Sequence, residues 1–563
     1  MTRSLYSWLL IAIVVSCHTP KQTPQSAVVS ARAEASQIGI DILKKGGNAF
    51  DAMIATHLAL SVCYPNAGNI GGGGFLVYRK ADGTIGSLDY REKAPASADR
   101  DMYLDTAGNV IPDKSTLGGL AVGVPGSVAG LTAIHEKLGS LPFKDLVQPA
   151  IELAENGYVV TEKQARSFSS KREQFIHING KETRYAFPYQ VGDTVFNPEL
   201  AGALKRIQAH GRSGFYQGET ADQIVAKVSA TGGIITHDDL KNYQAVWRDP
   251  LRFSYKDLSL ISMAPPSSGG VCLAQMMGMI EAYDIKQYGH NSPEAMQVMI
   301  EAERRSYADR SEFLGDPDFV SIPVDSLMDK GYLQKRMLDF SWNQATLSSA
   351  IKPGGIVWNE SDETTHYSIL DKDGNAVSVT TTLNGSYGSK VYVEGSGFFL
   401  NNEMDDFSSK PGTPNMFGLV GSKANAIAPG KRMLSSMTPT IVEKNGKLWM
   451  IVGTPGGSTI ITSVFQTILN AYEFGMEMQA AVEAPRFHHQ WLPDVVVLEP
   501  NQFTQDQIQP LQEKNYTIEE KLTRIIGRVD AIMIAEEGAI STGADPRGDD
   551  AAGTDQSLLS GKD

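Results

Sequence analysis

Along the first two thirds of the chain, hydrophobic residues recur mainly at the three- and four-residue spacing of amphipathic helices. This spacing predicts helices over residues 31–45, 49–62 and 293–310. Asn48 and Ser292 stand just before the second and third of these, where a short polar side chain caps a helix by accepting from its first N–H groups. This part of the chain is therefore expected to be mainly helical, with some strands.

The spacing changes after residue 363, where apolar and β-branched residues form short alternating runs. Residues 365–370 and 376–383 flank an Asp-Gly turn and predict a hairpin, and residues 438–453 repeat the pattern around an Asn-Gly turn. A further helix is predicted over residues 458–475. Helices that accompany paired strands favour helical layers packed on β-sheets, so the expected fold class is α/β (α+β).

Length and charge narrow the range of functions. The chain of 563 residues is long enough for two to four domain-sized units and for a deeply buried site. Hydrophobic residues make up 42% and charged residues 20%, which is ordinary for a folded soluble protein. The net charge of −14 and the pI near 5.3 argue against a nucleic-acid partner, because binding a phosphate backbone requires a concentrated basic surface.

The N-terminus has the features of an export signal. An apolar run over residues 8–15 is too short to span a bilayer and leads into the tetrapeptide VVSC. This tetrapeptide resembles a bacterial lipobox, so we interpret residues 1–16 as a lipoprotein-type signal peptide and Cys17 as the lipidation site. Residues 17–27, rich in Pro, Gln and Thr, are interpreted as a tether. An ordinary secretory signal with an incidental cysteine is the alternative.

Cys63 and Cys272 are the other cysteines, and both stand among apolar residues. Two cysteines of an exported chain can pair, but the sequence does not place their Cα atoms within reach of a disulfide. Two buried free thiols are the preferred interpretation.

The segment ESDETTHYSI, residues 360–369, changes from acidic to strand-like at Thr364. A threonine hydroxyl is a weak nucleophile unless a base lies beside it, and a free α-amine on the same residue, with a pKa of about 7.7–8.0, can be that base. Thr364 has such an amine only after its bond to Glu363 is cut. Two threonines that open a strand can equally be β-branched residues in favourable packing positions, so composition leaves both interpretations open.

Further motifs, in one order, cover most of the chain. After residue 362 they are ETTHYSILDKDGNAVSVTTTLN, NNEMDDF, KRMLSSMTPTIV, GTPGGSTIIT, APRFHHQWLPD and DPRGDD. Before it they are DILKKGGNAFDA, GNIGGGGFLVYR, DYREKAPA, GVPGSVAGL, PPSSGG and YADRSEFLGDPDF. With these motifs, the chain from about residue 28 to about residue 550 resembles the γ-glutamyltransferases, which are N-terminal nucleophile hydrolases.

The resemblance implies a proenzyme that cuts itself between Glu363 and Thr364. The large subunit, residues 28–363, and the small catalytic subunit, residues 364–563, would stay together as a heterodimer in one αββα sandwich. The threonine would attack the γ-amide of glutathione or a related compound and pass the γ-glutamyl group to water or to an amino acid or dipeptide. No cofactor or metal is implied. The exported protein would be held at the bacterial cell envelope by a lipid on Cys17.

The resemblance also assigns the residues of the site. Substrate binding is assigned to Arg91, Asn384, Glu403, Asp406, Ser435 and Ser436. Catalysis is assigned to Thr364, Thr382, Gly456 and Gly457. The arginine and the serines would hold the substrate α-carboxylate, which suits a forked guanidinium, and the amide and carboxylates would hold the α-ammonium. The second threonine would orient the nucleophile, and the glycine N–H groups would stabilise the oxyanion. A structural ion pair for the arginine and strand packing for the second threonine are the alternatives.

Three histidines could suggest catalysis or metal binding, but we assign them neither role. His366 is interpreted as structural, and His488 and His489 are not expected to bind a metal, because adjacent strand residues face opposite sides and no third ligand is near.

Within residues 411–432, which resemble a loop that closes over the site, Phe417 stands where some relatives have a tyrosine. Because phenylalanine lacks the hydroxyl that could latch the loop, we expect a lid that is present but less firmly closed.

Two other functions are weighed against this one. A related acylase would act on another acyl group, but Arg91, Asp406 and the two serines suit a free amino-acid head group, which a glutaryl substrate lacks. A lipid-anchored protein that binds γ-glutamyl peptides without chemistry would keep the pocket and need no cut at Glu363.

Overall fold

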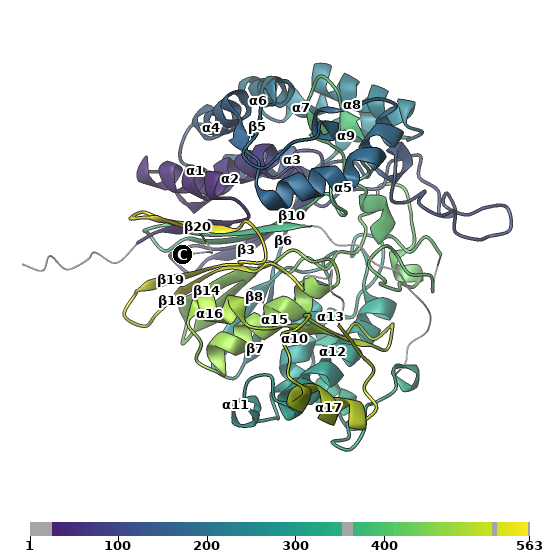
Figure 1. Ribbon diagram of the computed structural model, residues 1–563, viewed down its shortest axis with the longest axis vertical. Coiled ribbons are helices and arrows are strands. Elements are labelled where there is room, and N and C mark those ends of the chain that lie inside the picture. The colour runs from purple at the N-terminus through teal and green to yellow at the C-terminus, as the bar shows by residue number, and fades with distance from the viewer. Residues whose placement is uncertain (1–24, 352–363, 411, 521–525, 561–563) are drawn as a thin grey trace, which may run out of the picture.

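The computed structural model describes residues 25–351, 364–410, 412–520 and 526–560. Within these residues the chain forms a helical layer, two β-sheets that lie face to face, and a second helical layer (Figure 1). This is the αββα sandwich that the resemblance implies. The predicted signal peptide of residues 1–16, Cys17 and Glu363 lie outside the described residues.

The larger sheet has eight strands among the described residues, in the order β21-β20-β1-β9-β10-β2-β3-β6. Their bounds are Leu558–Ser560 for β21, Ala551–Thr554 for β20, Ala27–Ser30 for β1, Thr365–Leu370 for β9, Ala376–Thr382 for β10, Gly73–Arg79 for β2, Ile85–Asp89 for β3 and Val246–Arg248 for β6. The predicted hairpin is β9-β10, whose strands are antiparallel, and the prediction is confirmed.

The smaller sheet has six strands among the described residues, in the order β19-β18-β14-β13-β8-β7. Their bounds are Ile540–Ala544 for β19, Asp530–Ile534 for β18, Lys447–Gly453 for β14, Thr440–Lys444 for β13, Leu258–Ser262 for β8 and Leu251–Tyr255 for β7. The second predicted hairpin is β13-β14. Asn445 and Gly446 at its turn have φ of 52° and 75°, and positive φ at both central residues matches the twist of a tight hairpin.

Both sheets combine strands from before and after residue 364. In the larger sheet, β1 lies between β20 and β9, and β2 pairs with β10. In the smaller sheet, β8 pairs with β13. Two chains produced by a cut at this point would therefore share both ladders of hydrogen bonds, and they would stay together without a covalent link.

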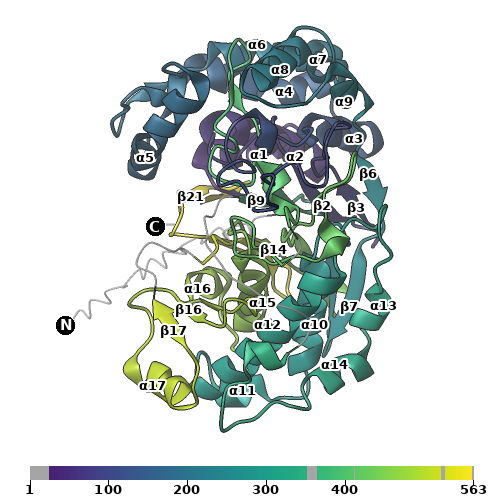
Figure 2. The same cartoon turned by 90° about the vertical axis from the view of Figure 1, so that its right-hand side faces the viewer.

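The helices form the two outer layers (Figures 1 and 2). Over the larger sheet lie α1 Ala33–Lys44, α2 Ala49–Cys63, α3 Ser127–Leu138, α4 Phe143–Asn156, α5 Glu162–Asn179, α6 Pro198–His210, α7 Ser213–Tyr216, α8 Glu219–Ala230 and α9 His237–Asn242. Over the smaller sheet lie α10 Gly269–Ile280, α11 Ile285–Tyr288, α12 Pro293–Phe313, α13 Val324–Leu327, α14 Lys330–Arg336, α15 Thr459–Tyr472, α16 Met478–Glu483 and α17 Gln505–Glu513. Short ladders join β4 Tyr158–Val159 to β5 Thr194–Val195, β11 Tyr392–Val393 to β12 Phe398–Phe399, and β15 Phe487–His488 to β16 Val496–Leu498 and β17 Ile518–Glu520.

The predicted helices are confirmed as α1, α2, α12 and α15. The Asn48 side chain accepts from the backbone N–H groups of residues 50 and 51, and the Ser292 hydroxyl accepts from that of residue 295. These contacts satisfy donors that have no partner within the helix, as expected for capping residues.

Neighbouring side chains of a strand belong to different hydrophobic cores, one under a helical layer and one between the sheets. In β1, Val28 belongs to the core under the first helical layer, whereas Val29 belongs to the core between the sheets. In β14, Val452 faces the second helical layer and Ile451 faces the other sheet. Successive strand side chains point to opposite faces, so each of these strands contributes apolar side chains to both cores.

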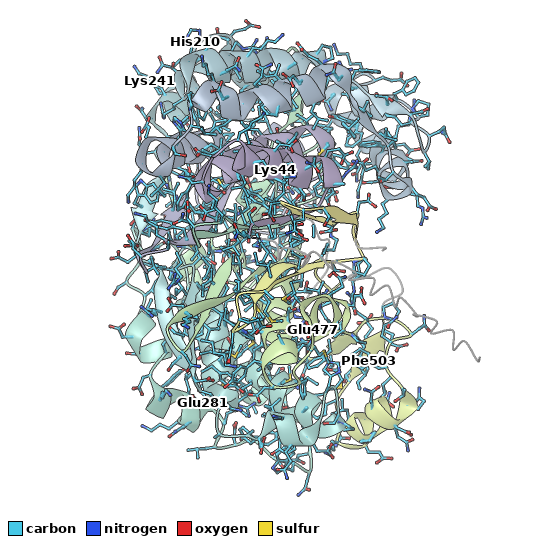
Figure 3. All side chains as sticks on the ribbon, turned by 90° about the vertical axis from the view of Figure 1, so that its left-hand side faces the viewer. Lys44, His210, Lys241, Glu281, Glu477 and Phe503 are labelled. Atoms are coloured by element: carbon cyan, nitrogen blue, oxygen red, sulfur yellow. The ribbon has the colours of Figure 1, made fainter. Side chains whose placement is uncertain are left out.

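Polar side chains cover the outside of both helical layers. His210 and Lys241 lie on the outer surface of the first layer and Glu281 on that of the second (Figure 3). Among the described residues, no helix is both long enough and apolar enough to cross a bilayer. Cys63 and Cys272 are buried free thiols, as predicted.

Candidate active site

Thr364 lies immediately before β9, beside the end of β10. Because Thr365 pairs with Thr381 in this ladder, the register brings Thr364 next to Thr382. The two Oγ1 atoms are 3.4 Å apart, and Thr382 Oγ1 accepts from the Asn384 N–H at 2.7 Å. Thr364 is only 3% exposed. The hairpin thus places the predicted nucleophile and the hydroxyl predicted to orient it in direct contact.

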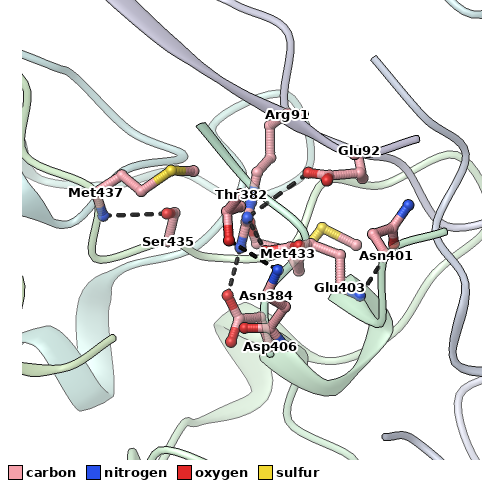
Figure 4. Close-up of polar contacts among 12 residues, drawn as sticks. Arg91, Glu92, Thr382, Asn384, Asn401, Glu403, Asp406, Met433, Ser435 and Met437 are labelled. Atoms are coloured by element: carbon pink, nitrogen blue, oxygen red, sulfur yellow. Dashed lines mark hydrogen bonds and ion pairs between the residues drawn. The ribbon is translucent and has the colours of Figure 1, made fainter. Parts of the chain in front are cut away.

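Arg91, which follows β3, forms the centre of a charged cluster (Figure 4). Its Nη1 donates to the Glu403 carboxylate and its Nη2 to the Asp406 carboxylate. Nη1 is also 3.7 Å from the Glu92 carboxylate, and Nε is 3.4 Å from the Met433 carbonyl oxygen. The arginine therefore forms the buried ion pairs named as its alternative, and its assigned contact with a substrate α-carboxylate stays a prediction.

Burial sets the protonation of the acids around this arginine. It raises the pKa of Glu92 to about 7 and raises the pKa of Glu403 and Asp406, although the positive charge of Arg91 opposes each shift. Glu403 Oε2 is buried and receives no hydrogen bond from the described residues. Because Glu403 and Asp406 both line the cavity, their carboxylates are suited to an incoming cation such as an α-ammonium group.

Ser435 and Ser436 precede β13 and are held against the segment that leads into α10. The Ser435 N–H donates to the Pro266 carbonyl at 2.9 Å, and Ser435 Oγ accepts from the Met437 N–H at 3.1 Å. Both serines are buried. Because Ser435 Oγ already accepts a hydrogen bond, its own proton remains to be donated to a ligand.

Gly456 and Gly457 form the turn between β14 and α15. Their φ values are 135° and 53°, which side chains with a Cβ rarely adopt, and a Cβ on Gly457 would lie 2.5 Å from the Phe417 ring. Their N–H groups donate to no described residue. Free N–H groups ahead of a helix N-terminus are suited to a developing oxyanion, in agreement with the predicted role.

The loop of residues 412–425 covers the site. Asn415 Nδ2 donates to Asp406 Oδ1 at 3.0 Å, and the Met416 N–H donates to Asp405 Oδ2 at 2.8 Å. Phe417 is 3% exposed and packs on the glycine turn. The predicted lid is therefore present, and the predicted looseness of its closure stays a prediction.

One small cavity gathers almost all of the predicted residues. Its lining includes Arg91, Thr364, Thr382, Asn384, Glu403, Asp406, Ser435, Ser436 and Gly457, together with Phe417, Leu419, Met437 and Ile460. Gly456 adjoins the cavity without lining it. Glu92 is the ion-pair partner expected in the alternative role of Arg91, whereas Asn415 has no sequence signal as a site residue, because its importance depends on its contact with Asp406.

The three histidines singled out from the sequence all make hydrogen bonds within the protein. His366 Nδ1 is 2.9 Å from Thr380 Oγ1, and burial lowers its pKa to about 3, so the ring is neutral. His488 contacts Thr462 and His489 contacts Asp494. Among the described residues, no group of His, Cys, Asp and Glu side chains is arranged to hold a metal ion.

Comparison with solved structures supports the same fold. Cephalosporin acylase from Bacillus halodurans superimposes with a TM-score of 0.82 at 26% identity, over 98% of each chain. A chain of the gamma-glutamyltranspeptidase of Helicobacter pylori is 44% identical, with a TM-score of 0.56, over 57% of this chain and 93% of its own.

Comparison of sequences gives the family. The family model described as Gamma-glutamyltranspeptidase matches residues 35–554. The glutathione hydrolase proenzyme of Escherichia coli (strain K12) is 45% identical over 94% of this chain and 91% of its own length. That of Pseudomonas sp. (strain A14) is 46% identical over 89% of each. The chain therefore belongs to the gamma-glutamyltranspeptidase family.

Proposed function

We propose that this protein is a self-processing γ-glutamyltransferase that hydrolyses glutathione and related γ-glutamyl compounds or transfers their γ-glutamyl group to an amine. The observation that carries the proposal is the contact between the Thr364 and Thr382 hydroxyls in a cavity whose wall holds Arg91, Glu403 and Asp406. Relatives named glutathione hydrolase proenzyme support it, at 45% and 46% identity.

Processing comes first in the proposed mechanism. The Thr364 hydroxyl attacks the Glu363 carbonyl carbon, and the peptide bond is replaced by an ester as the nitrogen gains a proton. Water then hydrolyses the ester, which returns the hydroxyl and leaves a free α-amine on Thr364. This amine has a reference pKa of about 7.7–8.0, so at neutral pH it can accept the hydroxyl proton that a peptide nitrogen cannot.

Acyl transfer follows at the same hydroxyl. Thr364 Oγ1 attacks the γ-amide carbonyl while its proton passes to the α-amine, and the N–H groups of Gly456 and Gly457 stabilise the oxyanion. The leaving amine takes up the proton and departs, which leaves a γ-glutamyl ester. Water, or the amine of an amino acid or peptide, attacks the ester and releases the product. The residues present supply each of these steps without a cofactor.

The covalent intermediate provides the test. Wild-type protein mixed with glutathione and quenched in acid should show the mass of one γ-glutamyl group on the chain that begins at Thr364. The same sample should release cysteinylglycine, and glycylglycine added as acceptor should appear as a γ-glutamyl product. Turnover without any modified chain would contradict the proposed ester, and absence of turnover would contradict the function.

A second candidate is an acylase for another dicarboxylic acyl group, because cephalosporin acylase from Bacillus halodurans shares the fold at 26% identity. A glutaryl group lacks an α-ammonium to pair with the carboxylates of Glu403 and Asp406 that line the cavity. Comparing kcat/KM for γ-glutamyl and glutaryl anilides decides between them, and faster turnover of the glutaryl compound would favour the acylase.

Substrate affinity should depend on pH through the acids of the cluster. Glu403 and Asp406 must be ionised to attract an α-ammonium group, and burial raises the pKa of both. Affinity should therefore be weak below the raised pKa values and should increase as the pH rises through them. Calorimetry with glutamate at a series of pH values from about 5 to about 8 should show Kd falling as the pH rises, by up to roughly tenfold per pH unit for each carboxyl group that ionises. A Kd that rises or stays constant over this range would contradict the assignment.

The substitution Phe417→Tyr tests whether the loop that covers the site is loosely closed because it lacks a hydroxyl at this position. A hydroxyl that latches the loop should exclude water better, so hydrolysis should fall relative to transfer by roughly 2- to 10-fold, the effect of one hydrogen bond. The measurement is the ratio of transfer to hydrolysis, together with kcat, in wild type and variant. Equal ratios and equal kcat would remove the idea of a loosely closed lid.

Export and anchoring are a separate part of the proposal. We infer that the protein is exported to the bacterial cell envelope and anchored by a lipid on Cys17, because VVSC follows a short apolar run. Wild-type protein should incorporate labelled fatty acid and sediment with membranes, and Cys17→Ala should lose the label and become soluble. A labelled Cys17→Ala protein, or an unlabelled wild type, would favour the ordinary secretory signal.

A further inference from the structure

Arg310 is a buried cation for which the mechanism above has no use. It lies near the end of α12 and is 5% exposed. Its Nε donates to Ser268 Oγ at 2.9 Å and its Nη2 donates to Ser436 Oγ at 3.1 Å. Among the described residues, Nη1 has no hydrogen-bond partner and no carboxylate lies within ion-pair distance of the guanidinium, which is attracted only at longer range by Asp406, the partner of Arg91.

Other buried arginines of the chain have acidic partners. These pairs are Arg304 with Asp494, Arg305 with Glu301, Arg432 with Asp89 and Arg486 with Asp545. Burial lowers the pKa of Arg310, yet a guanidinium remains charged in proteins. A buried charge without an ion pair of its own is costly unless a further anion arrives to balance it.

The positive charge that lines the cavity, that of Arg91, is already paired with carboxylates. Three of the N–H groups of Arg91 already point to Glu403, Asp406 and the carbonyl oxygen of Met433, and a fourth points to the carbonyl oxygen of residue 434. A substrate α-carboxylate that relied on Arg91 alone would have to approach a cation that two carboxylates already share. A second cation behind the two serines would offset this repulsion.

The hydrogen bond from Arg310 also determines which way Ser436 can donate. A serine hydroxyl has one proton, and because Ser436 Oγ accepts from Arg310, that proton is left for another acceptor. Ser436 lines the cavity. Ser268 Oγ in turn donates to the Ser435 carbonyl oxygen at 2.6 Å, so the contact of Arg310 with Ser268 helps to hold the neighbouring serine in place.

We propose that Arg310 is a positioning residue for the α-carboxylate of the γ-glutamyl substrate. It orients Ser436 so that the serine donates its proton to the carboxylate, and its charge balances that of the carboxylate from behind the cavity wall. The inference rests on the function proposed above and goes beyond it, because it makes recognition of the head group depend on a residue of α12 that does not line the cavity.

The test compares two substrates that differ only in the head group, a γ-glutamyl anilide and the same anilide with an α-carboxamide. Arg310→Gln should lower the ratio of kcat/KM for the carboxylate over the carboxamide by about 10- to 100-fold, mainly through KM. Arg310→Lys keeps the charge and loses the forked donor, so its ratio should lie between those of the wild type and Arg310→Gln. Ser436→Ala should also lower the ratio, and the double variant should lower it less than the product of the two single effects.

The control is Arg304→Gln on the same helix, which removes a buried arginine that pairs with Asp494 away from the cavity. It should lower stability and leave the substrate ratio unchanged. Self-cleavage into two chains shows that a variant has folded. If Arg310→Gln does not fold, the substrate ratios of Arg310→Lys and Ser436→Ala test the proposal instead. An unchanged ratio in the folded Arg310 variants would overturn the proposal.

Calorimetry with glutamate separates this inference from the function on which it rests. If the wild type turns over neither anilide, the proposed function fails. Weaker glutamate binding by Arg310→Gln, by about the same factor as the loss in the ratio, would support the role of Arg310 independently of turnover. Equal affinity in wild type and Arg310→Gln would overturn it.

Discussion

Thr364→Ala is expected to remain one uncut chain and to lose turnover of γ-glutamyl substrates by roughly four to six orders of magnitude, the cost of removing a catalytic nucleophile. Alanine has no hydroxyl to attack the preceding carbonyl, so the ester that leads to cleavage cannot form. Intact-mass spectrometry of the wild type should show two species, one of them matching residues 364–563. The variant should show a single species.

Thr365→Val is the matched control. Thr365 is fully buried in β9, and its Oγ1 has no hydrogen-bond partner among the described residues, so valine keeps its shape and removes an unused hydroxyl. This variant should cut itself as the wild type does. If the wild type itself remains a single full-length chain, the motifs have survived without the chemistry, and a protein that binds γ-glutamyl peptides becomes the better interpretation.

Local elements of the fold follow from local patterns. Alternation of apolar residues around an Asp-Gly turn predicts β9 and β10, and a polar residue before an apolar run predicts the starts of α2 and α12. The order of strands does not follow from such patterns. It places β1 between β20 and β9, more than 300 residues away along the chain, because side chains from distant segments must share one core.

The candidate site, like the fold, could be predicted only in part from the sequence. The resemblance identifies Arg91, Glu403 and Asp406 as site residues, and the structure brings them together at one cavity. Their mutual ion pairs could not be predicted, because each joins residues more than 300 positions apart. The same holds for Arg310, which lies within a quoted motif but whose significance depends on its contacts with Ser268 and Ser436 and on the lack of an ion pair of its own.

Arg91→Gln should lose both stability and substrate binding, for different reasons. Without the guanidinium, Glu403, Asp406 and Glu92 remain buried together with no direct cation, which should lower the free energy of unfolding by about 3–5 kcal/mol. The loss of a forked donor to the α-carboxylate should lower kcat/KM by roughly 10²- to 10³-fold. Thermal unfolding and steady-state kinetics measure the two effects separately.

The double variant Arg91→Gln/Glu403→Gln distinguishes two roles of Arg91, neutralising the buried carboxylates and binding the substrate α-carboxylate. It removes one negative charge together with the positive one, so it should recover much of the lost stability, because fewer buried carboxylates repel one another. It should not recover kcat/KM if Arg91 contacts the substrate, since neither glutamine offers a charged fork. Recovery of both would mean that Arg91 serves only to neutralise the acids, and the α-carboxylate would then be bound by the serines and the charge behind them.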